Sequence, residues 1–299
     1  MRTKPEYLQL HDSGELKKRI KEIERICTKC SLCPRNCGVD RTQTVGKCFS
    51  PITPVISSAG PHFGEEPPLV GYYGSGTIFF TNCNLNCIYC QNYDISQLHA
   101  GQDTSYEALA DLMVNMQDRR CHNINLVSPT HQVCSILRAL EIAIDKGLNL
   151  PLVYNSGGYD SVATLKLLEG IINIYMPDFK YYENETGKRL SNVNDYPAVA
   201  KKAITEMHRQ VGDLQTDQQG VAYQGLIVRH LILPGYLEES KKIIEFTASI
   251  SKGIYLNLMD QYRPAYKAAE DPKLTLRLSS TDYNELNTYA VDQGITLEK

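Results

Sequence analysis

Residues 77–92 read TIFFTNCNLNCIYCQN, and this stretch decides how the rest of the chain is interpreted. The segment Thr77–Thr81 is rich in β-branched and aromatic residues, a composition typical of a buried strand. Three cysteines follow it directly, at Cys83, Cys87 and Cys90, with the spacing C-x3-C-x2-C. Thiols this close together can meet around one metal centre, so the pattern indicates a metal site at the end of that strand.

Alternating strand and helix patterns continue from this stretch to the end of the chain. Further strands are predicted at Ile124–Val127, Leu152–Tyr154, Ile172–Tyr175, Leu226–Leu233 and Ile254–Leu258. Helices are predicted between and after them, at Tyr106–Asp118, Val133–Lys146, Ser161–Leu168, Pro197–Gln210, Glu238–Ser251 and Ser280–Val291. A hairpin is expected near Leu214–Tyr223. Six βα repeats imply an α/β fold with a parallel sheet, since each crossover helix returns the chain to the same edge. Six units suit a partial (β/α)6 barrel, with the active site at the carboxyl ends of its strands.

The first 70 residues do not follow this alternation. A helix is predicted at Glu15–Cys27, with Asp12 in the capping position. The stretch Cys30–Pro68 is rich in cysteine and proline and has no clear periodicity, so we expect it to fold around something other than its own core. The sequence thus predicts a helix with a cysteine-rich segment over residues 1–70 and the partial barrel over residues 71–299.

Composition narrows the class of protein and its location. The 299 residues include 34 acidic and 31 basic side chains, a net charge of −3. This balance argues against nucleic acid or an anionic membrane as a partner. No run of eighteen apolar residues is present, and the first residues lack the apolar core of a signal peptide, so we expect a cytoplasmic protein. Thiols stay reduced in the cytosol, and clustered reduced thiols are usually metal ligands.

The three-cysteine group can be interpreted in two ways. Zinc sites usually close with four ligands, and no fourth ligand of matching type lies beside these three. A [4Fe–4S] cluster normally takes four cysteines, so three leave one iron open to another molecule. A three-cysteine motif that directly follows the first strand of a βα series resembles the radical S-adenosylmethionine (SAM) enzymes.

That resemblance implies a [4Fe–4S] cluster on the three cysteines and SAM as the second cofactor. SAM would chelate the open iron, and one electron would cleave it to methionine and a 5′-deoxyadenosyl radical, so that the cofactors carry the difficult chemistry. Tyr89 occupies the aromatic position before the third cysteine, where the backbone of these enzymes usually meets adenine. A packing role for this tyrosine is the alternative.

A second group of cysteines precedes the first. The stretch Cys30-Ser-Leu-Cys33-Pro-Arg-Asn-Cys37-Gly-Val-Asp-Arg41, which is followed by Cys48, resembles an uncharacterised branch of proteins similar to the pyruvate formate-lyase activating enzyme. Four cysteines suit a second iron–sulfur cluster that relays electrons, or a structural zinc, and a metal-free loop is the third alternative. The match implies Cys30, Cys33, Cys37 and Cys48 as the ligand set. It leaves Cys27 spare, and Cys121 and Cys134 are expected to be isolated packing residues.

Polar residues follow the second and third predicted strands. Ser128 and Thr130 stand where radical SAM enzymes often carry a glycine-glycine-glutamate stretch, and they are candidates for SAM contacts or for helix capping. His131 is a candidate for contact with the substrate as a proton or hydrogen-bond donor. Asn155 lies beside two glycines that allow close backbone approach, and it could bond the ribose or carboxylate of SAM.

Charged residues follow the later strands. Asp178 and Lys180 resemble the D-x-K motif of glycyl-radical activating enzymes, and two residues apart on a strand they point the same way. They could bind the zwitterionic end of SAM. Arg229 lies in a V-R-x-x-x-x-P-G pattern and offers a fork suited to a carboxylate. Arg263 is a further candidate for substrate or SAM. For each of these residues a structural salt bridge is the alternative.

The resemblance favours a radical SAM enzyme that abstracts hydrogen from a protein or peptide, with a glycyl-radical enzyme as one candidate substrate. It also implies a flavodoxin or ferredoxin-type reductant as a partner. A radical SAM enzyme acting on a small molecule is the second hypothesis. A ferredoxin-like carrier with two clusters and no turnover is a third, and a zinc-stabilised binding module is the least favoured.

Overall fold

The computed structural model describes residues 4–295 and residue 297. Its helices are α1 (Tyr7–Asp12), α2 (Glu15–Cys27), α3 (Pro67–Val70), α4 (Tyr93–Ser96), α5 (Tyr106–Asp118), α6 (Val133–Asp145), α7 (Val162–Leu167), α8 (Asn184–Ser191), α9 (Tyr196–Val211), α10 (Leu237–Ile250) and α11 (Ser280–Asp292). Its strands are β1 (Val55–His62), β2 (Ser75–Phe80), β3 (Gln102–Asp103), β4 (Ile124–Val127), β5 (Leu152–Ser156), β6 (Ile174–Pro177), β7 (Gln215–Thr216), β8 (Ala222–Leu231) and β9 (Tyr255–Met259). Two 3-10 helices, η1 (Ala268–Glu270) and η2 (Pro272–Thr275), follow β9.

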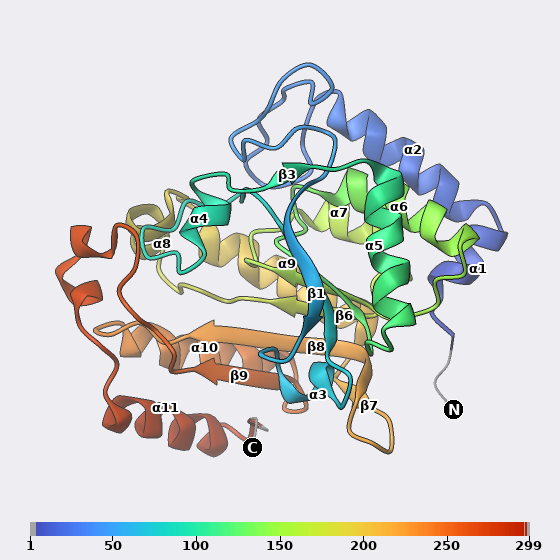
Figure 1. Ribbon diagram of the computed structural model, residues 1–299. Helices are drawn as coiled ribbons and strands as arrows, with labels where there is room; N and C mark the ends of the chain where they lie inside the picture. The colour runs from blue at the N-terminus through green and yellow to red at the C-terminus, as the bar shows by residue number, and fades with distance from the viewer. Residues whose placement is uncertain (1–3, 296, 298–299) are drawn as a thin grey trace.

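The strands form one sheet in the order β3-β1-β2-β4-β5-β6-β8, and both β7 and β9 pair with β8. Neighbours within the series β2, β4, β5, β6, β8 and β9 are parallel, whereas β1 is antiparallel to β2. Crossover helices such as α5, α6, α9 and α10 lie outside the curved sheet (Figure 1). No strand pair joins β9 to β1 or β3 within the described residues, so the barrel stays open on one side. The predicted α/β partial barrel is confirmed.

Several predicted elements differ from the structure at the N-terminal end. Strand β1 lies inside the stretch that showed no clear periodicity and for which no strand was predicted; it is ordered by pairing with β2. Asp12 ends α1 and does not cap α2, which is preceded by Gly14 with φ +73°, so the predicted cap is wrong. The predicted hairpin is present, as β7 pairs antiparallel with the start of β8. Helix α8 was not predicted, since its sequence is mostly polar.

The sheet has two faces with different cores. Its outer face packs on the helices, and Ile124 and Leu126 of β4 lie in this larger cluster. Its inner face lines the lumen of the barrel with a small apolar cluster, which consists of Leu69, Val153, Ile174, Met176, Ala222 and Ile227. Leu69 comes from α3, which therefore closes the lumen near the amino ends of the strands. The lumen is therefore lined by apolar residues at that end, and its polar residues lie toward the carboxyl ends of the strands.

Over residues 4–295, no helix combines the length and the apolar character needed to cross a bilayer.

Candidate active site

The three cysteines of the first group lie in the loop that leaves the carboxyl end of β2. Each sulfur has a hydrogen-bonding group beside it. The Leu85 N–H donates to Cys83 Sγ at 3.4 Å, the Ser191 hydroxyl donates to Cys87 Sγ at 2.9 Å, and Ser96 Oγ lies 3.1 Å from Cys90 Sγ. Donors aimed at sulfur stabilise the thiolate form, which is the form that ligates iron.

The three thiols are of the ligand type that iron–sulfur clusters take. No three Cys, His, Asp or Glu side chains lie around one ion position in the part of the chain that the structure describes. In a [4Fe–4S] cube each thiolate bonds a different iron, so the sulfurs stand farther apart than around one zinc. Burial and, to a smaller extent, the neighbouring Cys87 raise the pKa of the Cys83 thiol to about 12. Metal binding at this loop would therefore release protons.

Tyr89 packs behind the cysteine loop. Its side chain is buried, and its hydroxyl accepts a hydrogen bond of 2.7 Å from the Tyr181 hydroxyl. Tyr181 in turn lies 2.6 Å from Ser191 Oγ, the group that donates to Cys87. The segment after β9 also covers this loop, since Lys267 N–H donates to Ile88 O. The Tyr89 side chain thus fixes the back of the loop.

Four polar residues predicted from the strand ends do come together in the lumen. Asp178 Oδ2 lies 2.6 Å from Lys180 Nζ, and Asp178 Oδ1 lies 2.9 Å from Arg229 Nη2. The same Nη2 donates to Asn155 Oδ1 at 2.7 Å. Burial alone would raise the pKa of Asp178, but Arg229 and Lys180 outweigh it and hold the pKa below its ordinary value. This group offers both charge signs at the carboxyl ends of β5, β6 and β8.

Two acidic residues join this group that the sequence did not indicate. Glu65 and Glu66, in the segment between β1 and α3, have carboxylate oxygens 3.9 Å and 3.8 Å from Arg229 Nη1. Glu66 Oε1 also accepts from Asn257 Nδ2 of β9 at 3.1 Å. Burial raises the pKa of Glu65, and Arg229 opposes that rise. Because no motif surrounds this pair, only its tertiary position identifies it.

The loop after β4 differs from expectation at two of its three candidates. Thr130 Oγ1 donates to the buried Asp160 at 2.6 Å, and His131 Nε2 lies 2.9 Å from Thr81 O. Burial lowers the pKa of His131 to about 4, so the ring is neutral at pH 7. These contacts hold the loops together, and they do not support direct contact of Thr130 with SAM or of His131 with substrate.

The third candidate in this loop, Ser128, has a strained backbone with φ +58°. Its N–H donates to Asn155 O, which places it at the rim of the lumen. Strain of this kind is often found at ligand sites. Arg263 lies on the exposed surface after β9 and does not join the lumen group.

A close backbone approach fixes the position of Asp178. Gly158 has φ +74°, and a Cβ atom on it would lie 2.1 Å from Asp178 O. The Tyr196 hydroxyl accepts from Lys180 N–H at 2.9 Å, and it lies 2.9 Å from the carbonyl oxygens of Gly157 and Asp178. The loop after β5 is thereby held against the end of β6, and only glycine fits at residue 158.

The second cysteine group adjoins the first. Backbone N–H groups of Leu32 and Arg35 bond the sulfurs of Cys30 and Cys33, as in loops that prepare thiolates for metal. Electrostatic interactions link Cys33 with Cys30, Cys37 and Cys48.

Two hydrogen-bonding side chains join this segment to the three-cysteine loop. The Arg35 guanidinium donates to Asn84 O at 2.8 Å, and Asn82 Nδ2 donates to Ser50 Oγ at 3.1 Å. Cys27 and Cys134 are free cysteines, and their thiols form a hydrogen bond with each other. The expectation that Cys134 is isolated was wrong, since helices α2 and α6 pack together and bring the two thiols into contact.

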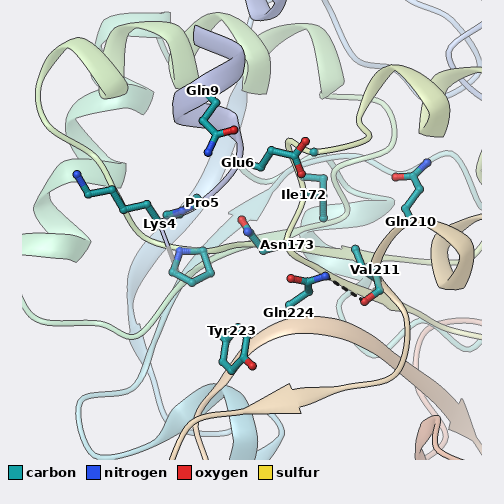
Figure 2. A pocket seen from close by; sticks show the side chains of 12 residues that line it. Lys4, Pro5, Glu6, Gln9, Ile172, Asn173, Gln210, Val211, Tyr223 and Gln224 are labelled. Carbon is teal, nitrogen blue, oxygen red and sulfur yellow. Dashed lines mark hydrogen bonds between the residues drawn. The ribbon is translucent and has the colours of Figure 1, made fainter. Parts of the chain in front are cut away.

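One surface pocket lies elsewhere, near the amino ends of β5, β6 and β8. Its volume is about 270 Å³, and Lys4, Glu6, Asn173, Gln210, Tyr223 and Gln224 are among its lining residues (Figure 2). The Gln224 side chain points toward Val211 and donates to its carbonyl oxygen. None of the candidate residues lies in this pocket, so it is separate from the candidate active site.

Comparisons with known proteins identify relatives of this chain. The model of the radical SAM superfamily matches residues 77–246. An uncharacterized protein of Methanocaldococcus jannaschii, MJ0674, is 33% identical over 271 residues, which is 87% of this chain and 74% of that protein.

Two solved structures are similar to this chain at low sequence identity. Streptococcus suis SuiB bound to the precursor peptide SuiA matches with a TM-score of 0.50 and 12% identity, over 72% of this chain and 45% of SuiB. Native anSMEcpe with bound AdoMet matches with a TM-score of 0.49 and 11% identity, over 78% of this chain and 62% of that one. This chain thus spans less than two thirds of either protein.

Proposed function

Because the chain belongs to the radical SAM superfamily, we propose that Cys83, Cys87 and Cys90 hold its [4Fe–4S] cluster. The family implies both this cluster and SAM. When bound and reduced, the cluster supplies one electron that cleaves SAM to methionine and a 5′-deoxyadenosyl radical, which abstracts a hydrogen atom from the substrate. The observation that carries this proposal is the cysteine loop itself, in which each sulfur has a hydrogen-bonding group beside it at the open end of the lumen.

The polar group below the loop would bind SAM. Lys180 and Arg229 are the cations available to a carboxylate, and Asp178 is the carboxylate available to an ammonium group. Asn155 and the rim residue Ser128 are the further proposed contacts. Ion pairs among these residues pre-position them before SAM arrives, which reduces the reorganisation that binding requires.

We also propose a second metal centre on Cys30, Cys33, Cys37 and Cys48. An iron–sulfur cluster is favoured here over zinc, because Arg35 and Asn82 bond this segment directly to the three-cysteine loop and such proximity suits electron relay. Metal analysis of a Cys33→Ala/Cys37→Ala variant tests the site. Loss of iron and sulfide supports a cluster, loss of zinc supports a structural ion, and unchanged content of all three rejects the site.

The proposed substrate is a protein or peptide, as for the enzymes similar to the pyruvate formate-lyase activating enzyme. The barrel is open beside β9, and an open side admits a polypeptide loop. SuiB, solved with a precursor peptide, is a precedent at the level of fold only. Glycyl-radical enzyme activation is the specific form proposed, with reduction by a flavodoxin or ferredoxin in the cytoplasm.

The test is reductive cleavage of SAM by the anaerobically reconstituted protein with dithionite. We expect 5′-deoxyadenosine from the parent and none from a Cys83→Ala/Cys87→Ala/Cys90→Ala variant. A SAM-dependent change in the cluster EPR signal without product would indicate that cleavage requires substrate. Absence of both would reject radical chemistry and favour an electron carrier. Incubation with candidate glycyl-radical enzymes should yield a glycyl EPR doublet, and its absence would refute the activating role alone.

A further inference from the structure

Asn125 points into the lumen from β4. Its neighbours Ile124 and Leu126 face the helices, and side chains alternate along a strand. Asn125 also stands in register with Val153, which belongs to the lumen cluster. It lies close enough to Glu65 to lower the pKa of that carboxyl group. Asn125 therefore shares the lumen with the two glutamates of the segment between β1 and α3.

Three polar atoms at this position have no hydrogen-bond partner among the described residues. They are Glu66 Oε2 and both Oδ1 and Nδ2 of Asn125. Asn125 Nδ2 is a donor, and it is the group of Asn125 that can act on the Glu65 carboxylate. Two oxygens, Glu66 Oε2 and Asn125 Oδ1, are thus left without a donor. Glu66 is 5% exposed and Asn125 is fully buried. Buried polar groups almost always have partners, so these atoms indicate a missing one, either a ligand or an ordered water molecule.

Arg229 cannot supply that partner. Its Nε and Nη2 atoms donate to Asp178 and Asn155. Its Nη1 atom lies 3.9 Å and 3.8 Å from Glu65 and Glu66, which is beyond hydrogen-bond length. The two glutamates are thus within electrostatic reach of one cation that is already committed to another carboxylate.

The charges here favour a cationic ligand. Three carboxylates, those of Glu65, Glu66 and Asp178, face two cations, Lys180 and Arg229. His62 lies 3.6 Å from Glu65 but is half exposed, and it counts as a cation only when protonated. The unpartnered or weakly partnered oxygens are those of Glu65, Glu66 and Asn125. A primary ammonium group has three donors and no acceptor, and it matches three such oxygens.

We propose that Glu65, Glu66 and Asn125 bind a primary ammonium group of the substrate, from a lysine side chain or an amino terminus of a polypeptide. The assignment of this ligand as substrate rests on the proposed function. The segment that carries the two glutamates reaches the surface of the protein, since Phe63 and Gly64 within it are exposed.

The probe is n-butylammonium chloride, added to the reconstituted full-length protein, with n-butanol and sodium chloride as matched controls. Isothermal calorimetry should show saturable binding of the ammonium only. Glu66→Gln should weaken it at least about tenfold, and Asn125→Asp, which adds an anionic oxygen, should strengthen it. Glu238→Gln, at a surface side chain that is 83% exposed, should leave it unchanged. Equal binding of butanol, or no loss of affinity in Glu66→Gln, would overturn the proposal.

Two further arms identify the source of the ammonium and separate this inference from the enzyme activity. A lysine peptide with an acetylated amino terminus is compared with a peptide whose amino terminus is free and whose lysine is acetylated. The peptide that competes with butylammonium identifies the source, and competition by neither refutes the proposal. A crystal structure with butylammonium that shows only water at these oxygens also refutes it. Parent protein that makes 5′-deoxyadenosine but binds no amine refutes this inference alone, whereas amine binding with neither SAM cleavage nor a SAM-dependent EPR change refutes the proposed function alone.

Discussion

Replacement of Gly158 by alanine should damage the candidate site more than a matched replacement elsewhere. Gly158 and Gly14 have nearly the same φ, +74° and +73°, so both substitutions place alanine in the left-handed region. That strain costs about 1–2 kcal/mol in each variant. The two positions differ in their surroundings. A Cβ at residue 14 meets nothing within 4 Å, whereas a Cβ at residue 158 would lie 2.1 Å from Asp178 O.

The extra cost of Gly158→Ala follows from what must move. The clashing atom is backbone, so no side-chain rotation relieves it, and the end of β6 must shift away from the loop after β5. The hydrogen bonds at the Tyr196 hydroxyl would be stretched, and two of them are worth about 1–3 kcal/mol together. We expect Gly158→Ala to be less stable than Gly14→Ala by about 2 kcal/mol, or about 4–8 °C in the midpoint of unfolding.

Circular dichroism of the two anaerobically prepared variants at one scan rate measures this difference. The movement of the end of β6 should also displace Asp178 and Lys180. Gly158→Ala should therefore bind SAM more weakly in equilibrium dialysis, whereas Gly14→Ala should bind it as the parent does. Equal unfolding midpoints in the two variants would refute the reasoning, since strain alone would then account for both.

Three other predictions concern charge, ligation and pH. Arg229→Met should destabilise the protein by about 3–5 kcal/mol at pH 7, because buried carboxylates lose a cation. The loss should shrink as the pH is lowered, because burial raises the pKa of Glu65 and favours its protonated form. Chemical denaturation of Arg209→Met, whose ion pairs lie at the surface, should show a much smaller loss of stability. Cys27→Ala should keep the metal content that Cys33→Ala/Cys37→Ala loses, and an equal loss of iron or zinc in both would place Cys27 among the ligands. His131 has a pKa lowered to about 4 in the folded protein, so its contribution to stability is complete above the unfolded value of about 6.5 and is lost as the pH falls toward 4. His131→Gln should therefore reduce the loss of stability between pH 7 and 5 by about 2 kcal/mol in urea titrations, and an unchanged slope would contradict a neutral buried ring.

Local sequence patterns predicted much of the fold and part of the candidate site. Strand Ile124–Val127 and helices Glu15–Cys27 and Tyr106–Asp118 were predicted with their observed bounds, because apolar periodicity and burial coincide there. Asp178 and Arg229 could be placed together, since parallel strands end at one edge of the sheet.

Other features depended on tertiary contacts. Glu65 and Glu66 reach Arg229 only because α3 inserts into the lumen, and no local pattern records that insertion. Thr130 and His131 bond Asp160 and Thr81 O, partners that are distant in the sequence and that no local pattern indicates. The contact of Cys27 with Cys134 likewise depends on how two helices pack.

Strand β1 also determines how this protein can be divided. It covers β2 along six residue pairs, from Ile56 with Phe80 to His62 with Ser75. A fragment that begins at residue 71 would retain the matched family region but leave β2 as an uncovered edge strand, rich in apolar residues and with free backbone donors and acceptors. Such edges pair with other chains and aggregate. Expression of the barrel without its first 70 residues should therefore yield insoluble material, whatever metal is supplied.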